Sequence, residues 1–157
     1  MIQLYKRMQR MREKYVDTLA KLYEYATTVY SKKQYTQWYD TKKGGYTYSE
    51  LKAKCDSLSK KLTQYGIGAG DKVAILSQSM PNWSVAFFSI APFGRIAIPI
   101  LPDSSENEVT NILNHSESKV IFVSQRLASK VSQECRDKMT LVIDIDTFEV
   151  IKADDDK

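Results

Sequence analysis

The chain has 157 residues, of which 43% are hydrophobic and 27% charged, and its formal net charge is +4. These values are those of an ordinary globular protein with one domain and a sizeable core, and no run approaches the roughly 18 apolar residues of a membrane span. The charge is uneven: residues 1–35 carry eight Lys or Arg and three acids, whereas residues 144–157 carry six acids and two Lys. A basic segment can bind nucleic acid or a membrane, but a solvated helix face is the commoner explanation.

The cysteines and the histidine limit the metal and disulfide chemistry that can be expected. Cys55 and Cys135 lie 80 positions apart on predicted helices, and His115 is the single histidine. This pattern favours neither a disulfide nor a metal site. Residues 1–14 are basic and amphipathic, without the continuous apolar segment of a signal peptide. We therefore expect a cytoplasmic protein, with peripheral membrane contact as a less favoured alternative.

Residues 1–30 have the period of one long amphipathic helix, or of two shorter ones. The apolar side chains recur at spacings of three or four, at Leu4, Met8, Met11, Tyr15, Leu19, Leu22, Ala26 and Val29. A basic helix of this kind can lie on an anionic membrane. Because the stripe uses Met and Tyr more than Leu, Phe or Trp, we favour packing on the protein's own domain or on a partner chain.

A β-hairpin is predicted next. Residues 35–40 and 46–48 are rich in aromatic and β-branched side chains, and they flank the turn sequence Thr-Lys-Lys-Gly-Gly at residues 41–45. Nine of the ten tyrosines precede residue 49. They could form a platform for bases or acyl chains, but cross-strand and core packing is the commoner use of such residues.

The hairpin leads into a helix with a clear beginning and end. Thr47 and Glu50 have the spacing of a capping box, and Gly66 is placed to close the helix. One face is apolar, at Leu51, Cys55, Leu58, Leu62 and Tyr65. The lysines on the other face are interpreted as solvated.

Residues 66–101 predict a strand–helix–strand unit around which the rest of the chain is arranged. Residues 73–76 and 96–101 are apolar runs without alternation, which is typical of strands covered on both faces. Pro81 fits the first turn of the helix between them, and Pro92 with Gly94 ends it. The expected apolar stripe of this helix is Trp83, Phe87, Ile90 and Ala91, and Val85 and Phe88 widen that face.

Two more helices and two more strands follow. Ser105 and Glu108 form a second capping box, and His115 lies at the end of the helix that it starts. Residues 120–123 and 141–143 are apolar strands, separated by a helix that Ser124 is expected to cap and that carries Leu127, Val131 and Cys135. The acidic residues from 144 onward are expected to be an exposed exit or a frayed end.

The predicted fold is α/β: a parallel sheet of about four strands with helices on both faces, preceded by a long N-terminal helix and a β-hairpin. We divide the chain into an amphipathic helical segment at 1–35, an α/β subdomain at 36–148 and an acidic segment at 149–157.

No catalytic set is visible. Gly66, Gly68 and Gly70 follow a helix and precede a strand, which is the reverse of a dinucleotide-binding loop. Asp71 and Asp103 are the best acidic candidates, but each is placed at a turn, where Asp commonly bonds the backbone. His115 has no partner of a catalytic type nearby in the sequence. We expect no catalytic, cofactor-binding or metal-binding residue in this chain.

Four motifs follow one another between residues 46 and 124. They are Thr47-Tyr48-Ser49-Glu50-Leu51, the run Gly66-Ile67-Gly68-Ala69-Gly70-Asp71-Lys72-Val73-Ala74-Ile75, Trp83, and Gly94 with Pro99. Together they resemble the beginning of the AMP-forming acyl-CoA synthetases of the adenylate-forming superfamily, closest to the long-chain fatty acid–CoA ligases. The resemblance covers roughly half of the chain.

The resemblance implies a ligase that uses ATP, Mg²⁺ and CoA to convert a fatty acid first to an acyl-adenylate and then to acyl-CoA. The family's Ser/Thr/Gly-rich phosphate loop ending in Pro-Lys-Gly does not occur in this sequence. We therefore expect an N-terminal portion of such an enzyme, inactive alone, whose partner is the remainder of the enzyme. The alternative is a non-catalytic interaction module of the same fold that associates through uncovered apolar surface. Nucleic-acid binding through residues 1–35 is not expected.

Overall fold

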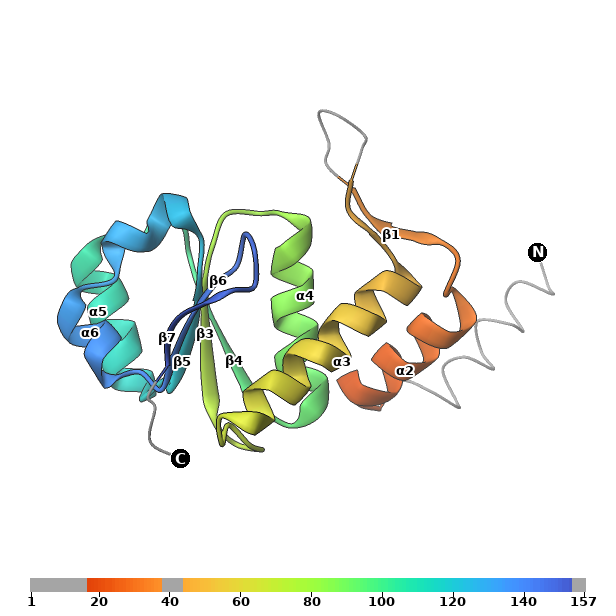
Figure 1. Ribbon diagram of the computed structural model, residues 1–157, viewed down its shortest axis with the longest axis horizontal. Helices are drawn as coiled ribbons and strands as arrows, with labels where there is room; N and C mark the ends of the chain where they lie inside the picture. The colour runs from red at the N-terminus through yellow and green to blue at the C-terminus, as the bar shows by residue number, and fades with distance from the viewer. Residues whose placement is uncertain (1–16, 38–43, 154–157) are drawn as a thin grey trace.

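The computed structural model describes residues 17–37 and 44–153. An N-terminal helix and hairpin lie beside a sheet that is layered between helices (Figure 1). The elements in chain order are α2 (Leu19–Val29), β1 (Gln34–Thr36), β2 (Tyr46–Thr47), α3 (Tyr48–Gln64), β3 (Lys72–Leu76), α4 (Pro81–Ile90), the 3₁₀ turn η1 (Ala91–Phe93), β4 (Ile96–Ile100), α5 (Glu106–Ser116), β5 (Val120–Val123), the 3₁₀ segment η2 (Gln125–Lys130), α6 (Gln133–Lys138), β6 (Leu141–Asp144) and β7 (Val150–Ala153).

The main sheet is mixed and has five strands, in the order β4-β3-β5-β6-β7. Four strands are parallel, as expected, and β7 pairs antiparallel with β6. The prediction of about four parallel strands was therefore one strand short. A short turn at residues 145–149 joins β6 to β7, and so short a connection permits only an antiparallel return.

The segment after residue 144 is less exposed than the sequence suggested. The residues expected to be an acidic exit include β7, and the turn before it begins with the fully buried Ile145. Asp144 itself is 7% exposed. The prediction of an exposed or frayed end was wrong for Asp144, Ile145 and β7, which belong to the sheet or its core, because the apolar residues 148, 150 and 151 allow the chain to return as a strand; Thr147, Glu149 and Ile151 are exposed. The proposed divisions of the chain at residues 35 and 148 stay predictions.

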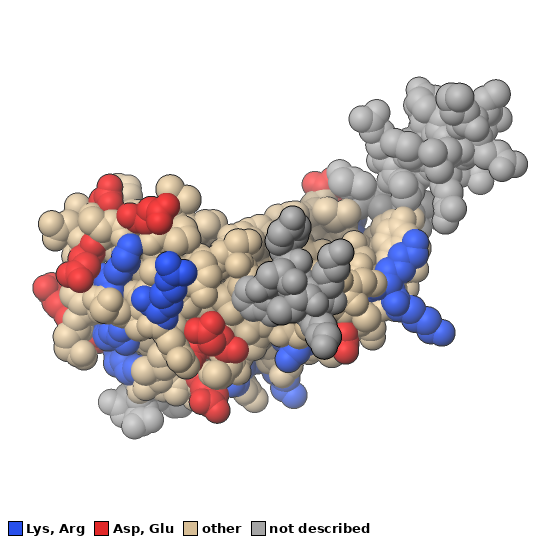
Figure 2. All heavy atoms as spheres, turned by 90° about the horizontal axis from the view of Figure 1, so that it is seen from above, with Lys and Arg blue, Asp and Glu red and all other residues tan. Residues whose placement is uncertain are grey.

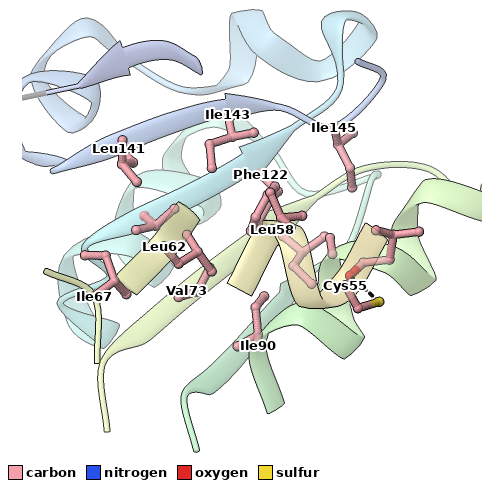
Figure 3. Packing of buried hydrophobic residues seen from close by; sticks show 14 of the residues in the cluster. Cys55, Leu58, Leu62, Ile67, Val73, Ile90, Phe122, Leu141, Ile143 and Ile145 are labelled. Carbon is pink, nitrogen blue, oxygen red and sulfur yellow. Dashed lines mark hydrogen bonds between the residues drawn. The ribbon is translucent and has the colours of Figure 1, made fainter. Parts of the chain in front are cut away.

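The three central strands are buried on both faces. Val73, Ile75 and Phe122 point to the face covered by α3 and α4, where they pack with Leu58, Leu62 and Val85 (Figure 3). Alternate residues, among them Ala74 and Ile121, point to the other face, which α5, η2 and α6 cover. The continuous apolar runs therefore predicted the two-sided burial of β3, β5 and β6 correctly.

Strand β4 differs from that prediction because it forms an edge of the sheet. Ile96 is 46% exposed, Leu101 just after the strand is 75% exposed, and Pro99 is exposed as well. The Ile96 N–H donates to the Asp71 carbonyl on the β3 side. Since backbone groups alternate along a strand, Ala97 and Pro99 turn theirs outward. Pro99 has no N–H, so it interrupts the open edge.

Helix caps were predicted well where a capping box marked them. Thr47 and Ser105 both form complete boxes, with Glu50 and Glu108 respectively. The prediction that Ser124 caps a helix was wrong: η2 begins there without a side-chain cap, and α6 is a separate helix capped by Ser132. The Ser124 hydroxyl instead donates to Gln78, because it lies buried between β5 and β3.

The hairpin and α2 form an aromatic layer beside the sheet. Strands β1 and β2 pair antiparallel as predicted, and the rings of Tyr35 and Tyr48 lie 5.0 Å apart. Tyr23 of α2 stacks on Phe88 at 6.0 Å, and its hydroxyl donates to Asp56 at 3.0 Å. The predicted helix is present at Leu19–Val29, whereas its expected beginning at residues 1–16 lies outside the described residues.

The buried face of α2 is not the stripe that the sequence indicated. Tyr23 and Thr27 are buried, while Leu19, Leu22 and Val29 are 37% to 48% exposed. In α4 the expected face is buried only in part: Val85 and Ile90 are buried, together with Ala86 and Ser89. Trp83, Phe87 and Phe88 are half-buried, and Trp83 stacks on Phe87 at 5.4 Å. Among the described residues, the helices are all too short or too polar to cross a membrane.

A buried arginine joins α3, α4 and the beginning of β4. The Arg95 guanidinium, 6% exposed, donates to the Ile67 carbonyl at 2.9 and 3.0 Å, to Ser59 Oγ at 2.8 Å and to Thr63 Oγ1 at 2.7 Å. Longer bonds reach the carbonyls of Ser59 and Ser89. Burial lowers the pKa of Arg95, and the nearby Asp71 carboxylate opposes that shift. One side chain thus satisfies carbonyls at the ends of two helices.

Replacing Arg95 is expected to destabilise the fold. Arg95→Ala leaves the Ile67 and Ser59 carbonyls without this donor, so the free energy of unfolding should fall by about 3 kcal/mol. Urea unfolding followed by circular dichroism measures the change. Arg126→Ala, at an exposed position, is the matched control and should change stability by less than about 0.5 kcal/mol. Equal effects of the two variants would contradict the role of Arg95.

Replacing Pro99 is expected to increase self-association. Pro99→Val restores a backbone N–H on the outward side of β4 and lengthens the pairing edge. Sedimentation velocity should show a larger fraction of dimer or higher species than in the unmodified chain. Pro102→Val, in the turn after the strand, is the control and should leave the distribution unchanged. No change with Pro99→Val would mean that the edge is protected in another way.

Candidate functional site at the carboxyl edge of the sheet

The carboxyl ends of β3, β5 and β6 lie side by side at one edge of the sheet. The chain runs from β3 to β4 on one side, and then crosses back over β3 to β5 on the other. Helix α4 leaves β3 on one face, and α5, after β4, packs on the opposite face. In open α/β sheets such a reversal leaves a crevice outside the carboxyl ends, which is the usual ligand position. The candidate site is therefore the carboxyl end of the sheet, at the point where β3 and β5 lie side by side.

Side-chain hydrogen bonds connect the ends of these strands. The fully buried Ser124 hydroxyl, after β5, donates to Gln78 Oε1, after β3, at 2.9 Å. Gln125 donates through its Nε2 to Asp144 Oδ2 at 2.8 Å and through its backbone N–H to Asp146 Oδ2 at 2.9 Å. The second Asp144 oxygen accepts from the Asp146 N–H at 2.8 Å. This end of the sheet thus carries amide, hydroxyl and carboxylate groups that already bond one another.

Asn82 extends this network to the hairpin. Its Nδ2 donates to the carbonyls of Ile145 at 2.8 Å and Asp146 at 3.0 Å, so the first turn of α4 holds the end of β6. Its Oδ1 accepts from the Tyr46 hydroxyl of β2. Burial raises the pKa of Tyr46, and the Glu50 charge adds to the shift, so Tyr46 stays a neutral donor at physiological pH.

The chemistry of the edge suits positioning more than reaction. The Asp144 and Asp146 carboxylates accept local hydrogen bonds, and the groups around them are amides and hydroxyls without an activating base. Within residues 17–37 and 44–153, no group of His, Cys, Asp and Glu side chains is arranged to hold a metal ion. The expectation that this chain has no catalytic, cofactor-binding or metal-binding residue stays a prediction.

The acidic candidates from the sequence lie away from this edge. Asp71, at the amino end of β3, bonds the Gly68 N–H at 2.7 Å and pairs with Lys119 at 2.8 Å. Asp103 is exposed in the turn between β4 and α5, and His115 is exposed in the last turn of α5. The structure therefore does not bring these three residues together, and Asp71 has the turn role that was expected of it.

The glycine run and the cysteines also have structural positions. Gly66 and Gly70 have positive φ angles of 74° and 82° in the turns between α3 and β3. Cys55 and Cys135 are both buried and free. Burial raises the pKa of Cys55 to about 12, so its thiol is protonated and unreactive at neutral pH.

The residues that build the edge were missed by sequence reasoning. No role was predicted for Gln78 or Asn82, Ser124 was interpreted as a helix cap, and Asp144 was interpreted as part of an acidic tail. The available signal was positional: polar side chains directly follow the ends of three apolar strands. Since parallel strands end at one edge, this pattern could have predicted a polar cluster there.

Comparisons with known proteins agree with this architecture. The family model of the AMP-binding enzymes matches residues 24–157. The chain belongs to this family. Long-chain-fatty-acid–CoA ligase FadD13 of Mycobacterium tuberculosis is 35% identical over 76 residues, which is 48% of this chain and 15% of that protein. 4-coumarate–CoA ligase 2 of Oryza sativa subsp. japonica is 28% identical over 114 residues, which is 71% of this chain and 20% of the ligase.

Solved structures show the same fold. A fatty acyl CoA synthetase of Mycobacterium tuberculosis aligns with a TM-score of 0.66 and 27% identity, over 72% of this chain and 22% of that one. The anthranilate CoA ligase AuaEII, solved with anthranoyl-AMP, aligns with a TM-score of 0.72 and 19% identity, over 80% of this chain and 24% of that one. The α/β fold of the adenylate-forming N-terminal subdomain is therefore present, and the chain spans a quarter or less of these relatives' length.

The Asp71–Lys119 pair makes stability depend on pH. The Lys119 bond, followed by the Gly68 N–H, lowers the pKa of Asp71 below its ordinary value of 3.8. Asp71 therefore stabilises the fold above that value, and the contribution is lost as the pH falls through the lower, folded-state pKa. Asp71→Asn should cost about 1 kcal/mol at pH 7 and nothing in strong acid.

Urea unfolding at a series of pH values measures this difference. Asp103→Asn, which alters an exposed carboxyl in another turn, is the control and should change stability by less than about 0.5 kcal/mol. A stability difference for Asp71→Asn that stays constant into strong acid would contradict the ionic origin of the effect.

Proposed function

We propose that this chain is the N-terminal portion of an ATP-dependent ligase that joins long-chain fatty acids to CoA. The observation that carries the proposal is the family match over residues 24–157, supported by the similarity to the fatty-acid–CoA ligase FadD13. The complete enzyme would use ATP and Mg²⁺ to form an acyl-adenylate and would then transfer the acyl group to CoA. Its fatty acid, ATP, Mg²⁺ and CoA would all be bound with the participation of the remaining polypeptide.

The role proposed for this chain is to supply a rigid wall. The carboxyl end of the sheet presents a fixed polar surface against which further segments can fold. Its side chains are held by hydrogen bonds from Ser124 to Gln78 and from Gln125 to Asp144. The remainder of the enzyme is therefore the proposed partner. Two buried, free cysteines fit a reducing compartment, and we propose a cytoplasmic location, with peripheral membrane contact less favoured.

The 157-residue chain alone is expected to form no adenylate. With ATP, Mg²⁺, palmitate and hydroxylamine, it should give no palmitoyl hydroxamate above the protein-free background, because its sequence has no phosphate-binding loop. An intact long-chain fatty acid–CoA ligase serves as the positive control in the same assay. Hydroxamate formation by the purified chain would contradict the proposal that it is a non-catalytic portion.

A second function is favoured by the exposed apolar side chains. Leu101, Ile96 and Phe93 at one edge of the sheet are 75%, 46% and 38% exposed. A non-catalytic module could use this surface to bind a partner or a second copy of itself. The two functions are distinguished by the coding sequence: a frame that continues into a Ser/Thr/Gly-rich loop ending in Pro-Lys-Gly supports the ligase, and a stop codon after Lys157 supports the module.

Nucleic-acid binding remains disfavoured. On the face shown in Figure 2, basic and acidic side chains are interspersed over the described surface and form no basic stripe there, while the basic residues 6–14 lie outside the described residues. Backbone-tracking nucleic-acid proteins need such a stripe.

A further inference from the structure

A groove runs between α3 and the turn that joins β6 to β7. It has a volume of about 700 Å³ and is lined by Ala53, Lys54, Ser57, Leu58 and Lys61 of α3 and by residues 147–150. The α3 residues follow the spacing of one helix face. The volume is within the range of small-molecule sites, which is about 300–1,000 Å³.

The floor of the groove is apolar. Leu58 is 5% exposed and belongs to the core that covers the sheet, and the half-buried Phe148 and Val150 pack against the same core. Figure 3 shows Leu58 between the helix and the sheet, beside Phe122. The floor is thus rigid and continuous with the interior, so an apolar ligand would extend the packing that is already there.

One wall of the groove has a strained backbone. Phe148 has a φ angle of +63°, which a bulky side chain rarely adopts. Its N–H donates to the Asp144 carbonyl at 2.7 Å, and its own carbonyl accepts from Lys61 Nζ at 3.4 Å. The turn is therefore held in a costly conformation that sets the Phe148 ring beside α3.

The charged side chains that line the groove add up to one positive charge, and the Glu50 carboxylate, which does not line it, interacts with Lys54. Lys54 and Lys61 line it on α3, and Glu149 lines it on the turn. The lysines are seven residues apart, which corresponds to about 10 Å along a helix. Lys54 Nζ also lies 5.2 Å from the centre of the Tyr46 ring, so it is held near the hairpin end of the groove. A ligand with one negative charge is complemented, whereas a polyphosphate would meet Glu149.

We propose that this groove binds an amphiphilic carboxylate, with its apolar body on Leu58, Phe148 and Val150 and its carboxylate on Lys54 or Lys61. The apolar floor favours a ligand with an apolar body, and the lysines favour a ligand with a negative charge. We draw this from the groove alone, so it holds whether or not the chain is part of a ligase.

Binding is tested with decanoate on the uniformly ¹⁵N-labelled 157-residue chain. Nuclear magnetic resonance titration should shift the amide signals of residues 53–61 and 147–150 in a saturable way. Decanol, which has no charge, should bind at least about tenfold more weakly than decanoate, since a charge-assisted contact is worth about that factor. Inorganic phosphate has no apolar body to bury on the floor, so it should also bind at least about tenfold more weakly. Decanol that binds as tightly as decanoate would overturn the proposal, and so would shifts that map elsewhere.

A matched pair of variants tests the lysines. The double variant Lys54→Gln with Lys61→Gln should weaken decanoate binding about tenfold or more, for the same reason. Lys60→Gln, an exposed lysine of the same helix that does not line the groove, should leave binding unchanged. Equal losses in both variants would show a general charge effect and overturn the proposal. Should the double variant not fold, the comparison of decanoate, decanol and phosphate on the unmodified chain still decides.

Discussion

Burial of the central strands on both faces is the constraint on which the rest of this structure depends. Residues such as Val73 and Phe122 need cover on one side of the sheet, and Ala74 and Ile121 need it on the other. A sheet of this kind is stable only between two layers of helices, which is why a helical crossover joins each parallel strand to the next parallel strand. The positions of α3, α4, α5 and α6 follow from that requirement.

Hydrogen-bonded polar side chains lie at the amino and carboxyl ends of these buried strands. At the amino end, Arg95 satisfies carbonyls of α3 and α4, while Asp71 bonds the turn before β3. At the carboxyl end, Gln78 and Ser124 join β3 to β5. Burying a polar group costs free energy unless the group is hydrogen-bonded, so these contacts favour one arrangement of the strand ends. The carboxyl edge thereby becomes a rigid surface of the kind that an adenylate-forming enzyme can build upon.

The open surfaces of the molecule show where further contacts can form. β4 leaves one edge of the sheet exposed, interrupted by Pro99, and the groove between α3 and the β6–β7 turn opens beside the other edge. The relatives that share this fold are several times longer than the chain. An exposed edge and an apolar surface agree with the proposed place of the chain in a longer enzyme, and the lysine-lined groove is set apart from them by its charge.

The sequence by itself determined the family, the order of the strands up to β6, the two capping boxes and the two-sided burial of β3, β5 and β6. Each depends on residues close together in the chain or on a simple repeat of apolar positions. Only the tertiary structure decided that β4 is an edge, that Tyr23 and not Leu22 is the buried face of α2, and that Ser124 bonds Gln78 instead of capping a helix. The physical reason is that burial and hydrogen-bond partners depend on which strands become neighbours, and local pattern does not specify that.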